Sequence, residues 1–150
     1  MIPKIIHYFY DDVPIYKKST NPTFRICYTS WKQNLPDYEF KLWHVGMPEF
    51  QEMLKQSHFL RICFKEKMWA FIADYVRHYA LYIYGGIYLD TDVQVLKSFE
   101  PFLKDGLFCS IEGDIKNGHN IPETAVLGAE KNHSIIKARP EMQEAEPGHF

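Results

Sequence analysis

The chain has 150 residues, 46% of them apolar and 16% aromatic, and its 17 basic and 19 acidic side chains give a net charge of −2. This composition supplies enough apolar side chains for one domain with a buried core, and it argues against a disordered chain. The sequence contains no long basic stripe, so nucleic acid is not an expected partner. It also contains no run of about 18 apolar residues, so no membrane-spanning helix is expected.

Cysteine usage and the first residues indicate the compartment. The three cysteines, Cys27, Cys63 and Cys109, are odd in number and far apart, and they show no metal-binding spacing. We therefore expect buried free thiols in a reducing cytosol. The chain enters a strand pattern almost at once, without a charged segment followed by a long apolar one, so no secretory signal is expected.

Hydrophobic periodicity predicts strands and helices along the first half of the chain. We expect a buried strand over residues 5–10, a loop over 11–21 that contains Pro14 and is followed by Pro22, and a helix over 25–34. A strand with alternating apolar residues is expected over 38–43, and a helix that begins at a proline over 48–57. Residues 59–64 are ambiguous.

The strongest helix prediction covers residues 66–84, and Gly85 follows it as a stop signal. An apolar strand comes directly after this helix, which is an α/β arrangement. Two later strands are expected over 107–111 and 124–128, and a further helix begins at residue 133.

The end of the chain has a different composition from the rest. From residue 139 onward it is polar and rich in proline and glutamate. We therefore expect one folded unit over residues 1–138 and a disordered tail over residues 139–150.

Residues 85–95, Gly-Gly-Ile-Tyr-Leu-Asp-Thr-Asp-Val-Gln-Val, are the most informative segment. Asp90 and Asp92 stand two apart at the end of an apolar strand, so their side chains are expected to point to the same side. Adjacent carboxylates raise each other's pKa unless a positive group lies between them. Because Mg²⁺ and Mn²⁺ prefer carboxylate oxygens and leave positions open for phosphates, the segment predicts a metal–diphosphate site. The alternative is a solvated strand end with two surface acids.

The long helix carries a second charged pair. Asp74 and Arg77 lie three residues apart and so share a helical face. Most of the surrounding residues are apolar, which indicates that the pair approaches the interior near the strand end and faces a ligand there. The alternative is an ordinary local ion pair at the surface.

Four blocks of the chain, residues 2–7, 30–32, 36–43 and 73–93, resemble in order and spacing the sequences of glycosyltransferase family 32. These sugar-transferring enzymes are built around a DxD motif and include bacterial capsule and lipopolysaccharide transferases and the yeast initiating mannosyltransferase. The resemblance implies a GT-A fold, a Rossmann-like α/β/α sandwich that binds a nucleotide sugar.

The resemblance also implies roles for individual residues. Asp92 would bind the metal directly, and Asp90 would contact the metal, the ribose or the sugar. Asp74 and Arg77 would contact the donor sugar or its nucleotide. Asp90, Asp92 and Arg77 are therefore the expected catalytic residues, with Mn²⁺ or Mg²⁺ as the cofactor.

Residues of the first strand complete the expected substrate site. By resemblance, His7 and Tyr8 would lie at the end of that strand, against the base and the ribose, and Gly86 would also contact the donor. The alternative for His7 is a strand histidine with a satisfied hydrogen bond. Trp31 and Trp43 are expected to be core residues rather than stacking platforms.

The reaction that the resemblance implies moves a hexose from a nucleoside diphosphate sugar to a hydroxyl of a glycan or lipid-linked acceptor, with retention of configuration at C1. We expect a cytoplasmic protein. Peripheral contact with the inner face of a membrane is compatible with a lipid-linked acceptor, although no basic amphipathic anchor stands out in the sequence.

The chain departs from the family pattern in two respects. Ala73 stands where the family usually has serine, and family members are commonly longer, so that a segment closing over the donor would be missing. A truncated product is expected on this basis. Two alternatives stay open: a non-catalytic donor-binding fragment or subunit, and a phosphohydrolase of the DxD type, whose motif normally lies on the first strand.

Overall fold

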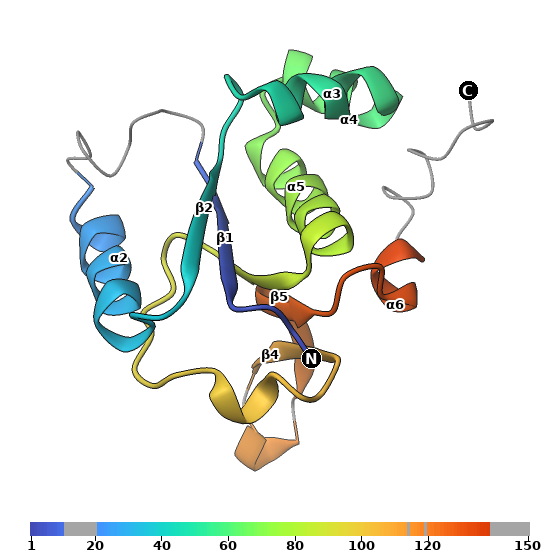
Figure 1. Ribbon diagram of the computed structural model, residues 1–150. Coiled ribbons are helices and arrows are strands. Elements are labelled where there is room, and N and C mark those ends of the chain that lie inside the picture. Colours follow the sequence, from blue (N-terminus) through green and yellow to red (C-terminus); the bar gives the residue numbers. More distant parts are fainter. Residues whose placement is uncertain (11–20, 114, 119, 139–150) are drawn as a thin grey trace.

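The computed structural model describes residues 1–10, 21–113, 115–118 and 120–138, and it shows a five-stranded sheet with helices on both faces (Figure 1). The strands are β1 (Ile5–Phe9), β2 (Glu39–Trp43), β3 (Gly86–Leu89), β4 (Leu107–Glu112) and β5 (Ile121–Ala129). The helices are α2 (Pro22–Asn34), α3 (Pro48–Gln56), α4 (His58–Lys65), α5 (Trp69–Tyr84) and α6 (Ser134–Lys137), with short 3-10 turns η1 (Glu100–Phe102) and η2 (Ile115–Asn117). The expected α/β fold class is confirmed.

The strand order is β2-β1-β3-β5-β4, and it creates a switch point beside β1. The chain leaves β1 through α2 to reach β2 on one side, and then returns through α3, α4 and α5 to β3 on the other side. Strand β1 is parallel to both β2 and β3, whereas β5 is antiparallel to β3 and β4. The carboxyl ends of β1 and β3 therefore lie side by side, at the kind of position where open α/β sheets bind ligands.

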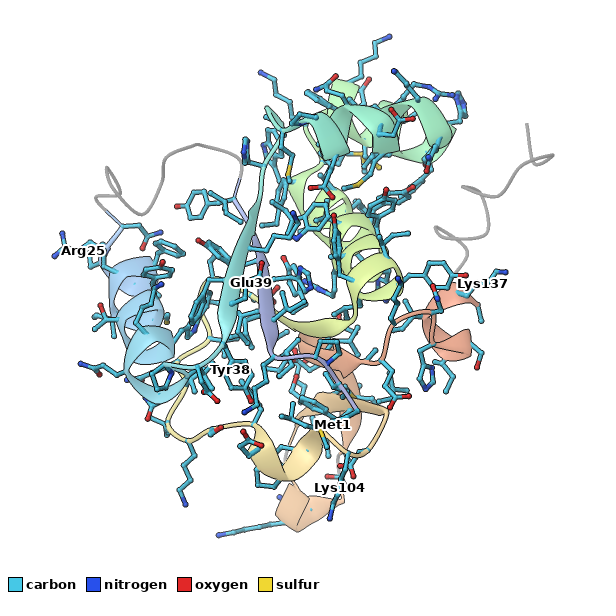
Figure 2. The ribbon with its side chains drawn as sticks, viewed as in Figure 1. Met1, Arg25, Tyr38, Glu39, Lys104 and Lys137 are labelled. Atoms are coloured by element: carbon cyan, nitrogen blue, oxygen red, sulfur yellow. The ribbon has the colours of Figure 1, made fainter. Side chains whose placement is uncertain are left out.

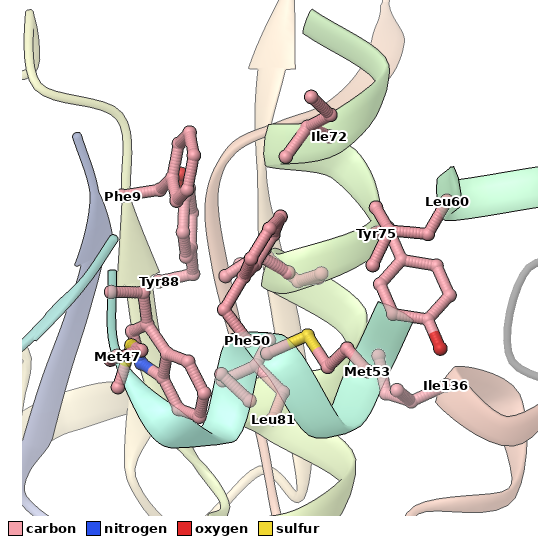
Figure 3. Close-up of a cluster of buried hydrophobic side chains, with 14 of the residues drawn as sticks. Phe9, Met47, Phe50, Met53, Leu60, Ile72, Tyr75, Leu81, Tyr88 and Ile136 are labelled. Carbon is pink, nitrogen blue, oxygen red and sulfur yellow. The ribbon is translucent and has the colours of Figure 1, made fainter. Parts of the chain in front are cut away.

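Two apolar clusters cover the two faces of the sheet. Because side chains alternate along a strand, Tyr8 and Leu89 pack toward α2, while Phe9 and Tyr88 pack toward α5. Figure 3 shows the second cluster, in which Phe9 and Tyr88 face apolar side chains of α3 and α5. Charged side chains lie outside these clusters; Arg25 on α2 and Lys137 on α6 point outward on opposite sides of the molecule (Figure 2).

Several sequence predictions can be compared directly with this fold. Trp31 and Trp43 have no exposed surface, so their assignment to the core is confirmed. All three cysteines are free, as expected, but Cys109 is exposed rather than buried. The predicted loop at residues 11–21 and the tail at 139–150 lie almost entirely outside the described residues. None of the helices in the described ranges has the length and hydrophobicity needed to cross a membrane.

Helix boundaries differ from the predicted ones for identifiable reasons. Helix α2 begins at Pro22 rather than at residue 25, because Asn21 accepts a hydrogen bond from Phe24 N and proline suits the first helical position. The ambiguous residues 59–64 form most of α4. Helix α5 begins at Trp69 rather than at residue 66, because Lys67 adopts a positive φ of 55° and separates it from α4.

The Gly-Gly pair lets α5 enter the sheet beside β1. Gly85 has a φ of 68° and Gly86 a φ of 124°, and residues other than glycine rarely adopt such values. A Cβ atom at Gly86 would lie 2.6 Å from the carbonyl oxygen of Ile5 and 3.1 Å from Nε2 of His7. The second glycine is therefore required for the close approach of β3 to β1.

We expect Gly86→Ala to lower the free energy of unfolding by more than about 2 kcal/mol, because backbone strain and a backbone clash add together. Gly118→Ala is the matched control, since its φ of 75° is also positive but a Cβ there would meet nothing within 4 Å. That change should cost only about 1 kcal/mol. Urea unfolding of both variants measures the difference, and equal losses would contradict the close contact.

Candidate active site

The two acids lie in a turn after β3, not on the strand itself. Strand β3 ends at Leu89, and the backbone N–H of Asp90 then donates to the carbonyl oxygen of Ala125 at 2.9 Å. The N–H of Val93 donates to the carbonyl oxygen of Asp90 at 3.1 Å and closes the turn. The premise that both acids stand on the strand is therefore wrong, and strand alternation does not orient them. Asp90 is half-buried, whereas Asp92 is exposed.

Side chains of α2 hold the segment that follows this turn. Nε1 of Trp31 donates to the carbonyl oxygen of Val93 at 2.7 Å, and Nδ2 of Asn34 donates to the carbonyl oxygen of Val95 at 2.9 Å. Oγ of Ser30 accepts from the N–H of Val95 at 2.9 Å. The sequence placed Ser30 in a family block without a role and predicted only burial for Trp31, and these contacts give both residues a role beside the turn.

Arg77 joins three elements around the acidic turn. Its Nη2 lies 2.6 Å from Oδ1 of Asp90, and its Nη1 donates to Oγ1 of Thr124 on β5. Nη1 also lies 3.6 Å from Oδ1 of Asp74, and the guanidinium is 4.6 Å from the centre of the Tyr88 ring. The predicted approach of the Asp74–Arg77 pair to the interior is confirmed, but the closer partner of Arg77 is Asp90.

The electrostatics of this cluster distinguish the two acids. Burial raises the pKa of Asp90, and the charges of Asp92 and Glu123 act in the same direction, while Arg77 opposes them. Nε of Arg77 is buried and has no hydrogen-bond partner among the described residues. Asp92 makes no ion pair with any residue in the described ranges. Asp90 is therefore ion-paired with Arg77 inside the protein. Asp92 is the carboxylate that is open to an external cation.

An open cleft of about 360 Å³ adjoins the turn at the switch point between β1 and β3. It is bounded by the end of β1, the first turns of α5 and the residue between the two acids: Phe9, Tyr10, Trp69, Ala70, Ala73 and Thr91. Sequence reasoning did not select Tyr10 or Trp69. Their positions, directly after a strand and at the start of a helix, become informative only once the strand order is known.

His7 and Tyr8 do not reach this cleft. His7 has no exposed surface; its Nδ1 accepts from Nε1 of Trp43 at 3.0 Å, and its Nε2 lies 2.9 Å from the carbonyl oxygen of Gly85. Tyr8 is 2% exposed and packs against α2. Gly86 is buried against β1. The structure therefore fits the alternative for His7, a structural histidine, and it assigns Tyr8 and Gly86 to packing.

The acidic turn can supply only part of a metal site. No group of three or more His, Cys, Asp or Glu side chains suited to a metal occurs in the part of the chain that the structure describes. Mg²⁺ in phosphate-handling sites is usually held by one or two carboxylates together with substrate phosphates. Asp90 and Asp92 fit that donor set, because the remaining ligands would come from the substrate and from water.

A mixed α/β sheet with a cleft at its switch point and an acidic turn beside that cleft is typical of nucleotide-binding enzymes. The family described as "Glycosyltransferase sugar-binding region containing DXD motif" matches residues 22–108. Since this match covers more than half of the chain, the chain belongs to this family of glycosyltransferases.

Two comparisons describe its relatives. An uncharacterized glycosyltransferase of Acanthamoeba polyphaga mimivirus is 30% identical over 144 residues, which cover 91% of this chain and 53% of the relative. The chain thus spans about half the length of this relative. The structure is similar to that of the PaToxG glycosyltransferase, with a TM-score of 0.67 and 18% identity over 97% of this chain and 66% of the other. The expected GT-A-type fold is confirmed.

We expect His7 to make stability depend on pH. Burial lowers its pKa from 6.5 to about 4, so the folded protein leaves the ring neutral while the unfolded chain takes up a proton. The free energy of unfolding should therefore fall as the pH falls from 6.5 to about 4, by about 3 kcal/mol in total. His7→Gln should flatten this dependence in urea unfolding, whereas exposed His58→Gln should leave it intact. An unchanged slope in His7→Gln would contradict this assignment.

We also expect the ion pair between Arg77 and Asp90 to be energetically coupled. Arg77→Met and Asp90→Asn should each destabilise the protein, and the double variant should lose at least about 1 kcal/mol less than the sum of the two. The exposed pair of Lys55 and Glu52 is the control, and its coupling should stay below about 0.5 kcal/mol. Additive losses at Arg77 and Asp90, measured by urea unfolding, would show that the contact contributes nothing.

Proposed function

We propose that this chain binds the sugar donor of a metal-dependent glycosyltransferase of family 32. The enzyme would move a hexose from a nucleoside diphosphate sugar to a hydroxyl of a glycan or glycolipid, with retention of configuration at C1. The observation that carries the proposal is the cleft between the carboxyl ends of β1 and β3, which opens directly beside the acidic turn.

The walls of the cleft suit a nucleoside. Phe9, Tyr10 and Trp69 line it, and flat aromatic rings offer apolar surface and stacking to a base. Ala73 lines the same cleft, on the first turns of α5. We propose that the nucleoside lies against these side chains and that its diphosphate extends toward Asp90 and Asp92.

The two acids would hold Mn²⁺ or Mg²⁺ together with the diphosphate of the donor. Asp92 is the proposed main ligand because it is exposed and unpaired among the described residues, and Asp90 is the second. A divalent cation at this position would neutralise the charge that develops on the departing diphosphate. Arg77 holds the carboxylate of Asp90 at 2.6 Å, which fixes the position of that second ligand.

Arg77 and Asp74 are proposed to act on the donor itself. The guanidinium of Arg77 is a second positive group beside the turn, and its side chain is 10% exposed. A fixed positive group at this position would stabilise negative charge on the donor. Asp74 follows Ala73, which lines the cleft, and its side chain is 24% exposed. Its carboxylate would accept hydrogen bonds from sugar hydroxyls and so orient C1 for attack.

We expect calorimetric titration with UDP- and GDP-sugars to detect binding that requires Mn²⁺ or Mg²⁺. Asp92→Asn should weaken this metal-dependent binding by at least about tenfold, because the amide cannot supply a charged ligand. The matched control is Asp105→Asn, which alters another exposed carboxylate, and it should bind like the unaltered chain. Equal binding by the Asp92 variant would exclude Asp92 as the main ligand.

One alternative function has an observation in its favour. The chain spans 53% of its relative, so a donor-binding fragment or subunit that needs a partner for transfer fits the comparison. Donor binding without sugar transfer or hydrolysis would favour that alternative. The DxD phosphohydrolase has no such support, because the family match is to glycosyltransferases and the motif follows β3 rather than the first strand.

A further inference from the structure

An exposed apolar surface lies at the corner where α4 meets α5. Ile62, Met68 and Phe71 are 46%, 39% and 51% exposed, although each is large and apolar. We refer to these three residues as the corner patch. Single exposed apolar residues need no explanation, but three within ten residues of one another, beside a candidate cleft, suit an interaction surface.

One ring contact and the positions of these residues on α4 and α5 bring them to the same corner. The ring of Phe71 packs against the ring of Phe59, with centroids 6.4 Å apart. Ile62 follows Phe59 by three residues on α4 and so shares its face. Met68 precedes Phe71 by one turn, and its carbonyl oxygen accepts the N–H of Phe71 at 3.1 Å.

The segment that carries Ile62 is basic, on a protein whose net charge is −2. Around the patch, residues 58–67 contain the basic side chains of Arg61, Lys65 and Lys67 and only one acidic side chain, Glu66. All four are exposed. An apolar patch with a basic border is the pattern of a surface that rests in the headgroup region of an anionic bilayer.

The patch also lies next to the candidate site. Trp69 and Ala70 follow Met68 directly in the chain and line the cleft at the switch point. Figure 1 shows α3 and α4 at the end of the sheet where β1 and β2 finish. A flat surface that contacted the corner patch would therefore lie close to the opening of the cleft.

We propose that the corner patch docks this protein onto a membrane that contains anionic lipids. The apolar side chains enter the headgroup region, and Lys65 and Lys67 contact lipid phosphates. A second copy of the chain is a poorer occupant, because it would bring two basic segments together. If the proposed function also holds, docking brings the cleft to lipid-linked acceptors.

Sedimentation with vesicles tests the docking without reference to catalysis. We expect the full chain to bind vesicles of phosphatidylcholine mixed with phosphatidylglycerol, and to bind pure phosphatidylcholine vesicles much less. The triple variant Ile62→Gln, Met68→Gln and Phe71→Gln should bind the mixed vesicles at least about tenfold more weakly. The control variant Leu96→Gln with Ile111→Gln removes apolar side chains that are 75% and 55% exposed elsewhere, and it should bind normally.

A charge variant and a fluorescence signal of the unaltered chain test the docking even if the triple variant fails to fold. Lys65→Gln with Lys67→Gln keeps every apolar side chain, and it should weaken binding and reduce its sensitivity to salt. Trp69 is 37% exposed while Trp31 and Trp43 are fully buried, so its fluorescence should shift to shorter wavelength on mixed vesicles. Equal binding by the triple variant, or no binding by the unaltered chain, would overturn the proposal. Loss of self-association instead of vesicle binding in the triple variant would also overturn it.

Discussion

The close contact between β1 and the start of β3 is the constraint on which the rest of this structure depends. Gly86 lies so near Ile5 that no side chain fits between the two backbones. This contact buries His7 between the strands and α5, and it fixes where β3 ends. Because the pairing with β1 sets the position at which β3 ends, the acidic turn that follows β3 lies beside the carboxyl end of β1.

The acidic turn is useful only because its two carboxylates are in different surroundings. Asp90 is half-buried and burial raises its pKa, while the guanidinium of Arg77 beside it acts in the opposite direction. Asp92 extends into solvent without such a partner among the described residues. Asp90 is therefore held in an ion pair within the protein, and Asp92 is available to bind a cation from solvent. A simple pair of equivalent surface acids would have neither property.

The sequence predicted those parts of the fold that depend on local pattern. The strands and the long helix follow from periodicity, and the place of Gly85 at the end of α5 follows from the conformational freedom of glycine. The sequence left two roles open for His7 and could not decide between them, since its two hydrogen bonds come from residues far away in the chain. The same holds for Arg77, whose partner Thr124 lies on a strand that pairs with β3 only in the folded sheet.

The acidic turn depends on side chains of α2, namely Ser30, Trp31 and Asn34. The chain after the acidic turn has no strand partner of its own between Val93 and Val95, and these α2 side chains bind its backbone directly. The conformation of the turn is therefore inherited from a helix encoded some sixty positions earlier. A DxD loop exchanged between relatives would keep its native conformation only if the matching helix were transplanted along with it.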